Sequence, residues 1–158
     1  MKVLIAQDES ECSQRAFEYV LERNWPVNSV FRIVNVHEPI HGYDPIIYAP
    51  HSIVSLKEAD REIYTAKEER LKNKLDLLKE KFLNMQVSGD ILTGHPKDCI
   101  IEEADRWGAD IIILGTHGRK GFARALHGSV AAQVAGEAEC SVEIIRARNI
   151  DKGRSKNG

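Results

Sequence analysis

Three glycines and a serine in the C-terminal half of the chain have types and spacing that suit phosphate binding. They are Gly115, Gly118, Gly128 and Ser129. The first pair follows an apolar run, Ile111 to Leu114, and the second precedes small residues with helical character, Val130 to Ala135. Glycines let a ligand approach the backbone closely, and the first turn of a helix offers unpaired N–H groups. The stretch therefore predicts phosphate bound between a strand and a helix start.

The charge distribution also favours an anionic ligand. The whole chain has 22 Lys and Arg against 24 Asp and Glu, yet residues 111–136 contain no acidic residue. Arg119, Lys120 and Arg124 all lie in this stretch. Local positive charge beside a helix start attracts anions. The alternative is an ordinary strand-to-helix loop with exposed basic residues, and the register of the glycines and the serine favours phosphate over it.

Two familiar phosphate motifs are absent. The chain has no G-x-x-x-x-G-K-[ST] sequence, which excludes a Walker-type P-loop, and no G-x-G-x-x-G follows the first strand, which argues against a dinucleotide-binding domain. What remains is G-x-x-G-x9-G-S, from Gly115 to Ser129. With Asp8 after the first strand and the turn Gly94-His95-Pro96, this motif resembles the nucleotide-binding signature of the universal stress protein family, in its ATP-binding subgroup.

The resemblance covers roughly Met1 to Arg146 and implies how a nucleotide is held. By this likeness, Asp8 and Val36 bind adenine, Leu114 lines the adenine or ribose, and the motif glycines and serine cradle phosphates. The nucleotide-binding residues expected in this chain are Asp8, Val36, Leu114, Gly115, Gly118, Arg119, Gly128, Ser129 and Val130. The expected ligand is ATP or AMP, with Mg²⁺ as an optional companion. No catalytic residue and no protein metal site are expected.

Length and composition limit the class of protein. A chain of 158 residues with 42% hydrophobic and 29% charged residues fits one soluble globular domain, expected over 1–147, with a flexible polar tail at 148–158. Apolar runs are only strand-length, so no membrane segment is expected. The three cysteines are widely separated, which favours reduced thiols and a cytoplasmic location. The basic tail is interpreted as solubilising, and nucleic-acid binding is not expected.

Apolar runs and helical stripes alternate along the chain, which predicts an α/β fold with a doubly wound parallel sheet and helices on both faces. The resemblance implies the strand order 3-2-1-4-5. Residues Glu38 to Ser55 are expected to be irregular because they hold three prolines and a glycine. The expected strands are Lys2–Ala6, Ser29–His37, Gln86–Thr93, Ile111–Leu114 and Ser141–Arg146; the expected helices follow Ser10 and occupy Leu56–Met85, Lys97–Trp107 and Val130–Ala135.

Of three acidic residues that bear on the site and the dimer, Asp8 matches the family pattern, whereas Glu9 and Glu143 depart from it. Asp8 ends the first strand, where open α/β sheets hold ligands, although an acid favoured by a helix start is the competing interpretation. Glu9 stands before Ser10, where the family usually has Gly-Ser. This carboxylate would repel a nucleotide or help to hold Mg²⁺ through water. Glu143 lies in the fifth strand, through which the resemblance implies homodimers, and opposes a symmetric pairing unless Arg146 of a second copy neutralises it.

The motif and the family resemblance together imply an adenine-nucleotide-binding regulatory protein of the stress response that works as a homodimer. Two alternatives stay open: a slow ATP hydrolase or nucleotide transferase, and a protein-interaction module with a vestigial pocket. The sequence does not specify which nucleotide is bound, the stress or the partner. His117 and His127 are the best candidates for a base, since histidine titrates near neutrality. The intact glycine–serine motif argues against a vestigial pocket.

Overall fold

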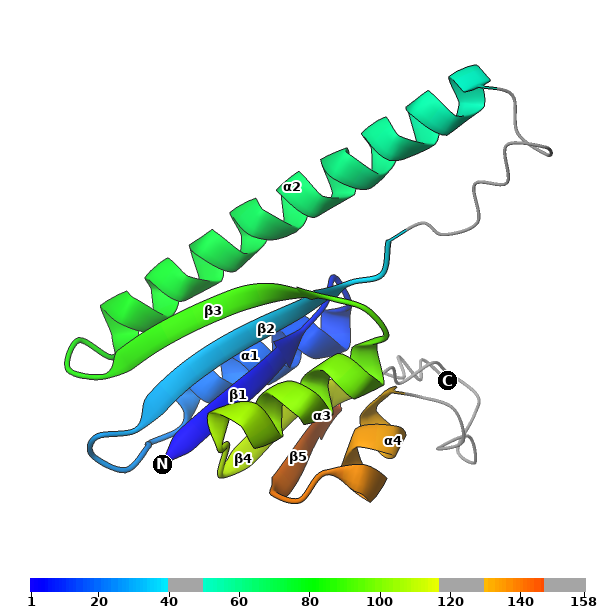
Figure 1. The fold of residues 1–158 in the computed structure, drawn as a ribbon. Helices are drawn as coiled ribbons and strands as arrows, with labels where there is room; N and C mark the ends of the chain where they lie inside the picture. Colours follow the sequence, from blue (N-terminus) through cyan, green and yellow to red (C-terminus); the bar gives the residue numbers. More distant parts are fainter. Residues whose placement is uncertain (40–49, 117–129, 147–158) are drawn as a thin grey trace, which may run out of the picture.

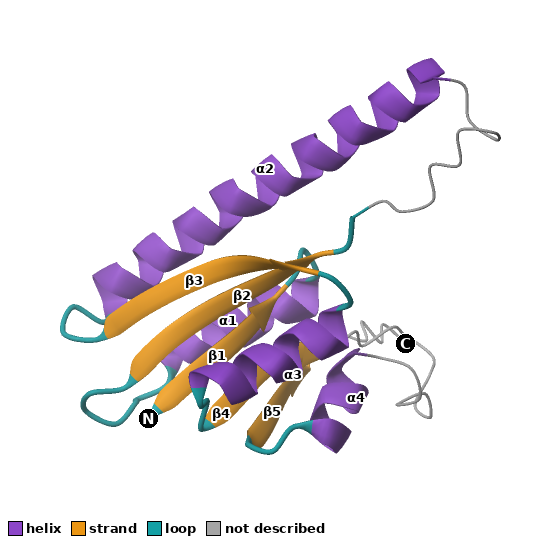
Figure 2. Ribbon diagram, in the orientation of Figure 1, coloured by secondary structure: helices purple, strands orange, loops and turns teal. Residues whose placement is uncertain are grey.

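In the computed structural model, strands and helices alternate from end to end (Figure 1, Figure 2). The structure describes residues 1–39, 50–116 and 130–146. The strands are β1 (Lys2–Gln7), β2 (Val30–His37), β3 (Gln86–Thr93), β4 (Ile111–Thr116) and β5 (Ser141–Arg146); the helices are α1 (Glu11–Glu22), α2 (Pro50–Lys81), α3 (Pro96–Trp107) and α4 (Val130–Glu137). All strand pairs are parallel, in the order β3-β2-β1-β4-β5. This confirms the predicted fold and the implied strand order. The expected tail, 148–158, lies outside the described residues.

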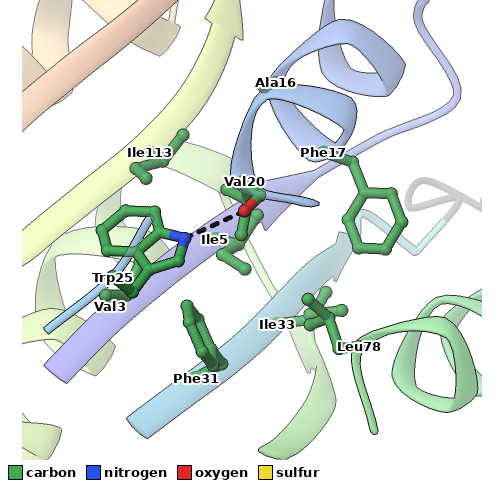
Figure 3. Packing of buried hydrophobic residues seen from close by; sticks show 10 residues of the cluster. All are labelled: Val3, Ile5, Ala16, Phe17, Val20, Trp25, Phe31, Ile33, Leu78 and Ile113. Carbon is green, nitrogen blue, oxygen red and sulfur yellow. Dashed lines mark hydrogen bonds between the residues drawn. The ribbon is translucent and has the colours of Figure 1, made fainter. Parts of the chain in front are cut away.

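The sheet is buried on both faces, and β1 contributes to both cores. Val3 and Ile5 pack on one side with α1 and α2, whereas Leu4 and Ala6 pack on the other with α3 and α4. This alternation follows from the two-residue period of a strand. Figure 3 shows the first core, in which Phe17 of α1 lies on the side of Ile33 and of Leu78 from α2. Helices on both faces make this a doubly wound sheet.

Ser10 caps the start of helix α1, and Trp25, which follows the helix, is hydrogen-bonded back to it. Ser10 Oγ accepts a hydrogen bond from the Ser13 N–H at 3.1 Å, as expected for an N-cap residue. Trp25 Nε1 donates to the Val20 carbonyl at 2.9 Å (Figure 3). The Trp25 ring meets Phe31 edge-on, with ring centroids 5.6 Å apart. The end of α1 is therefore fixed to the core that it covers.

Helix α2 begins earlier than the sequence predicts and extends well beyond the sheet (Figure 1). The expected irregular segment, Glu38 to Ser55, was too long, because the helix starts at Pro50. Proline is tolerated in the first turn of a helix, where its missing N–H is not needed. The helix also ends at Lys81, before the expected Met85. Only its C-terminal half packs on the core, through Leu71, Leu75 and Leu78.

Helix α3 has the end that its glycine predicts. Gly108 has φ of 69°, and its N–H faces the carbonyls of Ala104 and Asp105. This left-handed conformation suits glycine at a helix C-terminus. In the part of the chain that the structure describes, no helix is both long and apolar enough to span a bilayer.

Candidate functional site

A cavity lies where the connections from neighbouring strands leave for opposite faces of the sheet. β1 leads to α1 on one face and β4 leads to α4 on the other, and the two strands are paired, with Ala6 opposite Leu114. Open α/β sheets bind ligands at the carboxyl ends of strands at such a switch point. The cavity has a volume of about 510 Å³ and is lined by the ends of β1, β2 and β4 and the starts of α3 and α4. The predicted adjacency of the first and fourth strands is thus confirmed.

The structure brings together the described members of the expected site. Those that line the cavity are Asp8, Val36, Leu114, Gly115 and Val130. Four other expected contacts, and both histidines considered as bases, lie outside the described residues: Gly118, Arg119, Gly128, Ser129, His117 and His127. The apolar wall of the cavity is formed by Val34 of β2, Leu114 of β4 and Ile100 of α3. A flat apolar group the size of a base suits this wall.

Asp8 has a structural role and also faces the cavity. Its Oδ1 accepts hydrogen bonds from Ser10 N at 2.9 Å and Ser10 Oγ at 2.6 Å, and its own N–H donates to Ser13 Oγ at 2.9 Å. Among the described residues, Oδ2 receives no hydrogen bond. The two interpretations of Asp8 are therefore compatible, because one oxygen orders the start of α1 while the other is available to a ligand.

Gly115 is glycine because α1 crosses β4 at this point. A Cβ at this position would overlap the backbone of Cys12 and Ser13 in the first turn of α1. The sequence suggested that the motif glycines admit a ligand, but the group that approaches Gly115 most closely is a helix. Gly115 also lines the cavity. By letting α1 pack against β4, it helps to set the positions of the two elements that border the cavity.

Lys67 is a cavity residue that sequence reasoning missed. Its spacing from Leu71 and Leu75 places it on the apolar stripe of α2, yet only 8% of the residue is exposed and its ammonium points inward to Asn35 and Val36. Nζ donates to Asn35 Oδ1 and to the Val36 carbonyl, both at 2.9 Å. Its position on an apolar stripe was the available signal, since a buried lysine requires hydrogen-bond acceptors.

The extra carboxylate of Glu9 is balanced by basic residues of α2. Its Oε1 lies 3.2 Å from Arg70 Nη1 and 3.6 Å from Lys67 Nζ. Lys74, further along the helix, donates to Gln7 Oε1, and burial lowers the pKa of the Lys74 ammonium. The described residues contain no group of three or more His, Cys, Asp or Glu able to hold a metal ion. Glu9 therefore joins an ion-pair cluster at the mouth of the cavity.

A second cavity of about 440 Å³ adjoins the first beneath α2. The two share Glu9, Val36, Glu38 and Lys67 as lining residues. In the second cavity, His37 Nε2 lies 3.2 Å from Asp60 Oδ1. Lys67 therefore stands between the two cavities.

The fold and the cavity define an open parallel α/β protein whose candidate binding site lies at the switch point of the sheet. Within this class, the chain belongs to the universal stress protein family, because the family model matches residues 1–146. Universal stress protein Sll1388 from Synechocystis is 28% identical over 151 residues, which cover 92% of this chain and 97% of that protein.

Solved structures of the family share the fold. A universal stress protein solved in complex with cAMP is 24% identical, with a TM-score of 0.64 over 92% of this chain and 96% of that one. A family member from Arabidopsis thaliana solved with AMP bound is 23% identical, with a TM-score of 0.60 over 98% of this chain and 97% of that one. At these identities the likeness establishes the architecture.

Proposed function

We propose that this protein is an adenine-nucleotide-binding regulatory protein of the stress response that holds ATP or AMP in the switch-point cavity and acts as a homodimer. One observation carries the proposal. Residues expected from the family motif to contact a nucleotide come from distant parts of the chain, and Asp8, Val36, Leu114, Gly115 and Val130 all line the same cavity. Their convergence is what a single ligand site requires.

The chemistry of the cavity suits the parts of a nucleotide. Val34, Ile100 and Leu114 provide an apolar wall for the base, and the free Asp8 oxygen is an acceptor for a base amino group. Phosphates would extend toward Val130, where α4 begins, and a helix N-terminus stabilises anions. Gly118, Gly128 and Ser129, which precede α4 in the sequence, would complete that end of the site with Mg²⁺ as an optional companion. Two relatives that share this fold were solved with AMP and with cAMP, and this shared fold supports an adenine ligand here.

Calorimetric titration of ATP and AMP into the wild type and two variants tests the proposal. Asp8→Ala and Ser129→Ala should each weaken ATP binding about tenfold or more, because each removes a charge-assisted hydrogen bond of about 1.5–3 kcal/mol. Glu18→Ala is the control, since Glu18 pairs with Arg15 on the exposed side of α1, away from the cavity. Mass spectrometry of nucleotide released from the denatured protein would identify the resident ligand. Wild-type ATP affinity in both Asp8→Ala and Ser129→Ala would place the site elsewhere.

A further inference from the structure

The part of α2 that extends beyond the sheet carries a second apolar stripe (Figure 1). This outer stripe consists of Leu56, Ala59, Ile63 and Ala66, which are three or four residues apart and so follow one side of the helix. Ile63 is 46% exposed. We infer that the outer stripe is a docking surface for a basic amphipathic helix of a partner protein. None of its residues lines the switch-point cavity, so the inference does not rest on nucleotide binding.

The second cavity opens beside the outer stripe and offers room for an apolar side chain. Ile63 and Ala66 line this cavity, which has a volume of about 440 Å³, together with Val36 of β2. The stripe from Leu56 to Ala66 is about 15 Å long, the length of about three helical turns. A partner helix of this length could place one apolar side chain in the cavity and others along the stripe, as amphipathic helices do when they bind in grooves.

Carboxylates border the outer stripe and indicate the charge of its partner. Glu62 lies three residues after Ala59 and four before Ala66, and residues at these separations are neighbours on a helix surface. Glu69 borders the stripe in the same way, three residues after Ala66. Glu62 and Glu69 are exposed, and neither takes part in an ion pair within the part of the chain that the structure describes. Glu38 adds a carboxylate to the lining of the cavity.

The basic residues near the outer stripe do not neutralise this acidic border. Lys57 and Arg61 are each two residues from Ala59, and residues two apart do not face the same side of a helix. Arg70, one turn beyond the stripe, is paired with Glu9 at 3.2 Å. The surface therefore matches the apolar and basic faces of a cationic amphipathic helix. A second copy packed antiparallel on the stripe would instead bring two acidic borders together, where like charges repel.

The test measures, by fluorescence anisotropy, the binding of two synthetic peptides that are cross-linked to stay helical. One has leucine on one face and lysine on the other, and the second has glutamate in place of each lysine. Wild type should bind the lysine peptide at least about tenfold more tightly than the glutamate peptide. Ile63→Ala should weaken binding of the lysine peptide about fivefold or more, because apolar contact is lost. Val54→Ala is the matched control and should leave the affinity unchanged, since Val54 is 55% exposed on the opposite side of the helix, nine residues before Ile63.

A second pair of variants tests the charge of the surface. Glu69→Gln should weaken binding of the lysine peptide about twofold to fivefold at low salt, whereas Glu68→Gln, which removes the same charge from another side of the helix, should not. Circular dichroism establishes that each variant is folded. The inference is overturned if wild type does not bind the lysine peptide, if it binds both peptides equally, or if Ile63→Ala binds like wild type. Loss of a wild-type dimer in Ile63→Ala, measured by sedimentation, would assign the stripe to a second copy and also overturn it. None of these outcomes bears on nucleotide affinity, which tests the proposed function separately.

Discussion

At the residue scale, substitutions at Gly115 and Gly136 distinguish the effect of close packing from the effect of backbone flexibility. A Cβ at Gly115 would overlap backbone atoms of Cys12 and Ser13, whereas a Cβ at Gly136 in α4 would meet nothing within 4 Å. Gly115→Ala should therefore destabilise the protein by about 3 kcal/mol or more, because backbone in α1 cannot move aside cheaply. Gly136→Ala, the control, should stabilise it by about 0.5–1 kcal/mol, since alanine favours a helix interior.

Urea denaturation followed by circular dichroism would measure both changes. A Gly115→Ala protein with the wild-type midpoint would show that α1 does not constrain this position. Its binding of ATP, measured under conditions where the variant is folded, separates the packing role from a direct role in the site.

The residues of the candidate site differ in how well the sequence predicts them. Asp8 follows from its place at the end of the first strand, where ligands bind in open sheets, whereas Leu114 was implied by the family resemblance. The reason for a glycine at position 115 cannot be predicted from the sequence, because a motif glycine is equally compatible with a nearby ligand and with a nearby helix. Lys67 lies on the apolar stripe of α2, and nothing in the local sequence identifies its acceptors, because Asn35 and Val36 lie on β2. Such partners are found only when the chain is folded.

At the scale of elements, a three-residue cluster joins α1 to the edge strand β5. Glu143 of β5 accepts from Tyr19 Oη at 2.6 Å and from Arg23 Nη1 at 2.6 Å. The sequence suggested that Glu143 needs a cation from a second copy, but Arg23 of the same chain supplies it. The hydrogen bond to Glu143, followed by burial, raises the pKa of the Tyr19 hydroxyl.

This raised pKa predicts a loss of stability in alkaline solution. Below the unfolded-state pKa of about 10, Tyr19 is neutral in both states and its stabilising contribution is complete. As the pH rises through the folded pKa, that contribution is lost, since the unfolded state gives up the proton first. The free energy of unfolding should fall more steeply above pH of about 10 in wild type than in Tyr19→Phe. Urea midpoints at several pH values measure this, and parallel curves would contradict the prediction.

The boundaries of the elements show which local signals are reliable. The strand β3 begins and ends at the predicted residues, Gln86 and Thr93, even though Gly89 weakens its pattern. A Cβ at Gly89 would press against Ile33 O and the side chains of Leu71 and Leu75, so the glycine permits α2 to pack closely. The predicted start of α2 was wrong because the prolines were taken to indicate a loop. Pro50 instead occupies a first turn, where it is compatible with a helix.

At the scale of the whole molecule, alternation of strands and helices was sufficient to predict a parallel doubly wound sheet. The order of the strands came from the family resemblance, because local pattern does not say which strands are neighbours. That order places β5 at one edge of the sheet. An edge strand presents unpaired backbone groups to its surroundings, which makes β5 the place to test for the proposed homodimer.

The backbone of β5 shows which residues could pair with a second copy. The Ser141 N–H donates to the Asp110 carbonyl at 3.3 Å and so faces the rest of the sheet. Because successive residues alternate in direction, Val142, Ile144 and Arg146 turn their backbone groups outward. Glu143 is already paired with Arg23, which removes the main electrostatic objection to two copies of β5 meeting across a two-fold axis.

We predict that Ile144→Pro converts a dimer into a monomer. Proline lacks the outward N–H but is tolerated on an edge strand, so the ladder to β4 should survive. Ile144→Ala is the matched control, because it loses the same side chain, which packs against the α3–α4 core, yet keeps the N–H. Light scattering at micromolar concentration should show a dimer for wild type and Ile144→Ala and a monomer for Ile144→Pro. A monomeric wild type would refute the β5 dimer, and a dimeric Ile144→Pro would place the interface on another surface.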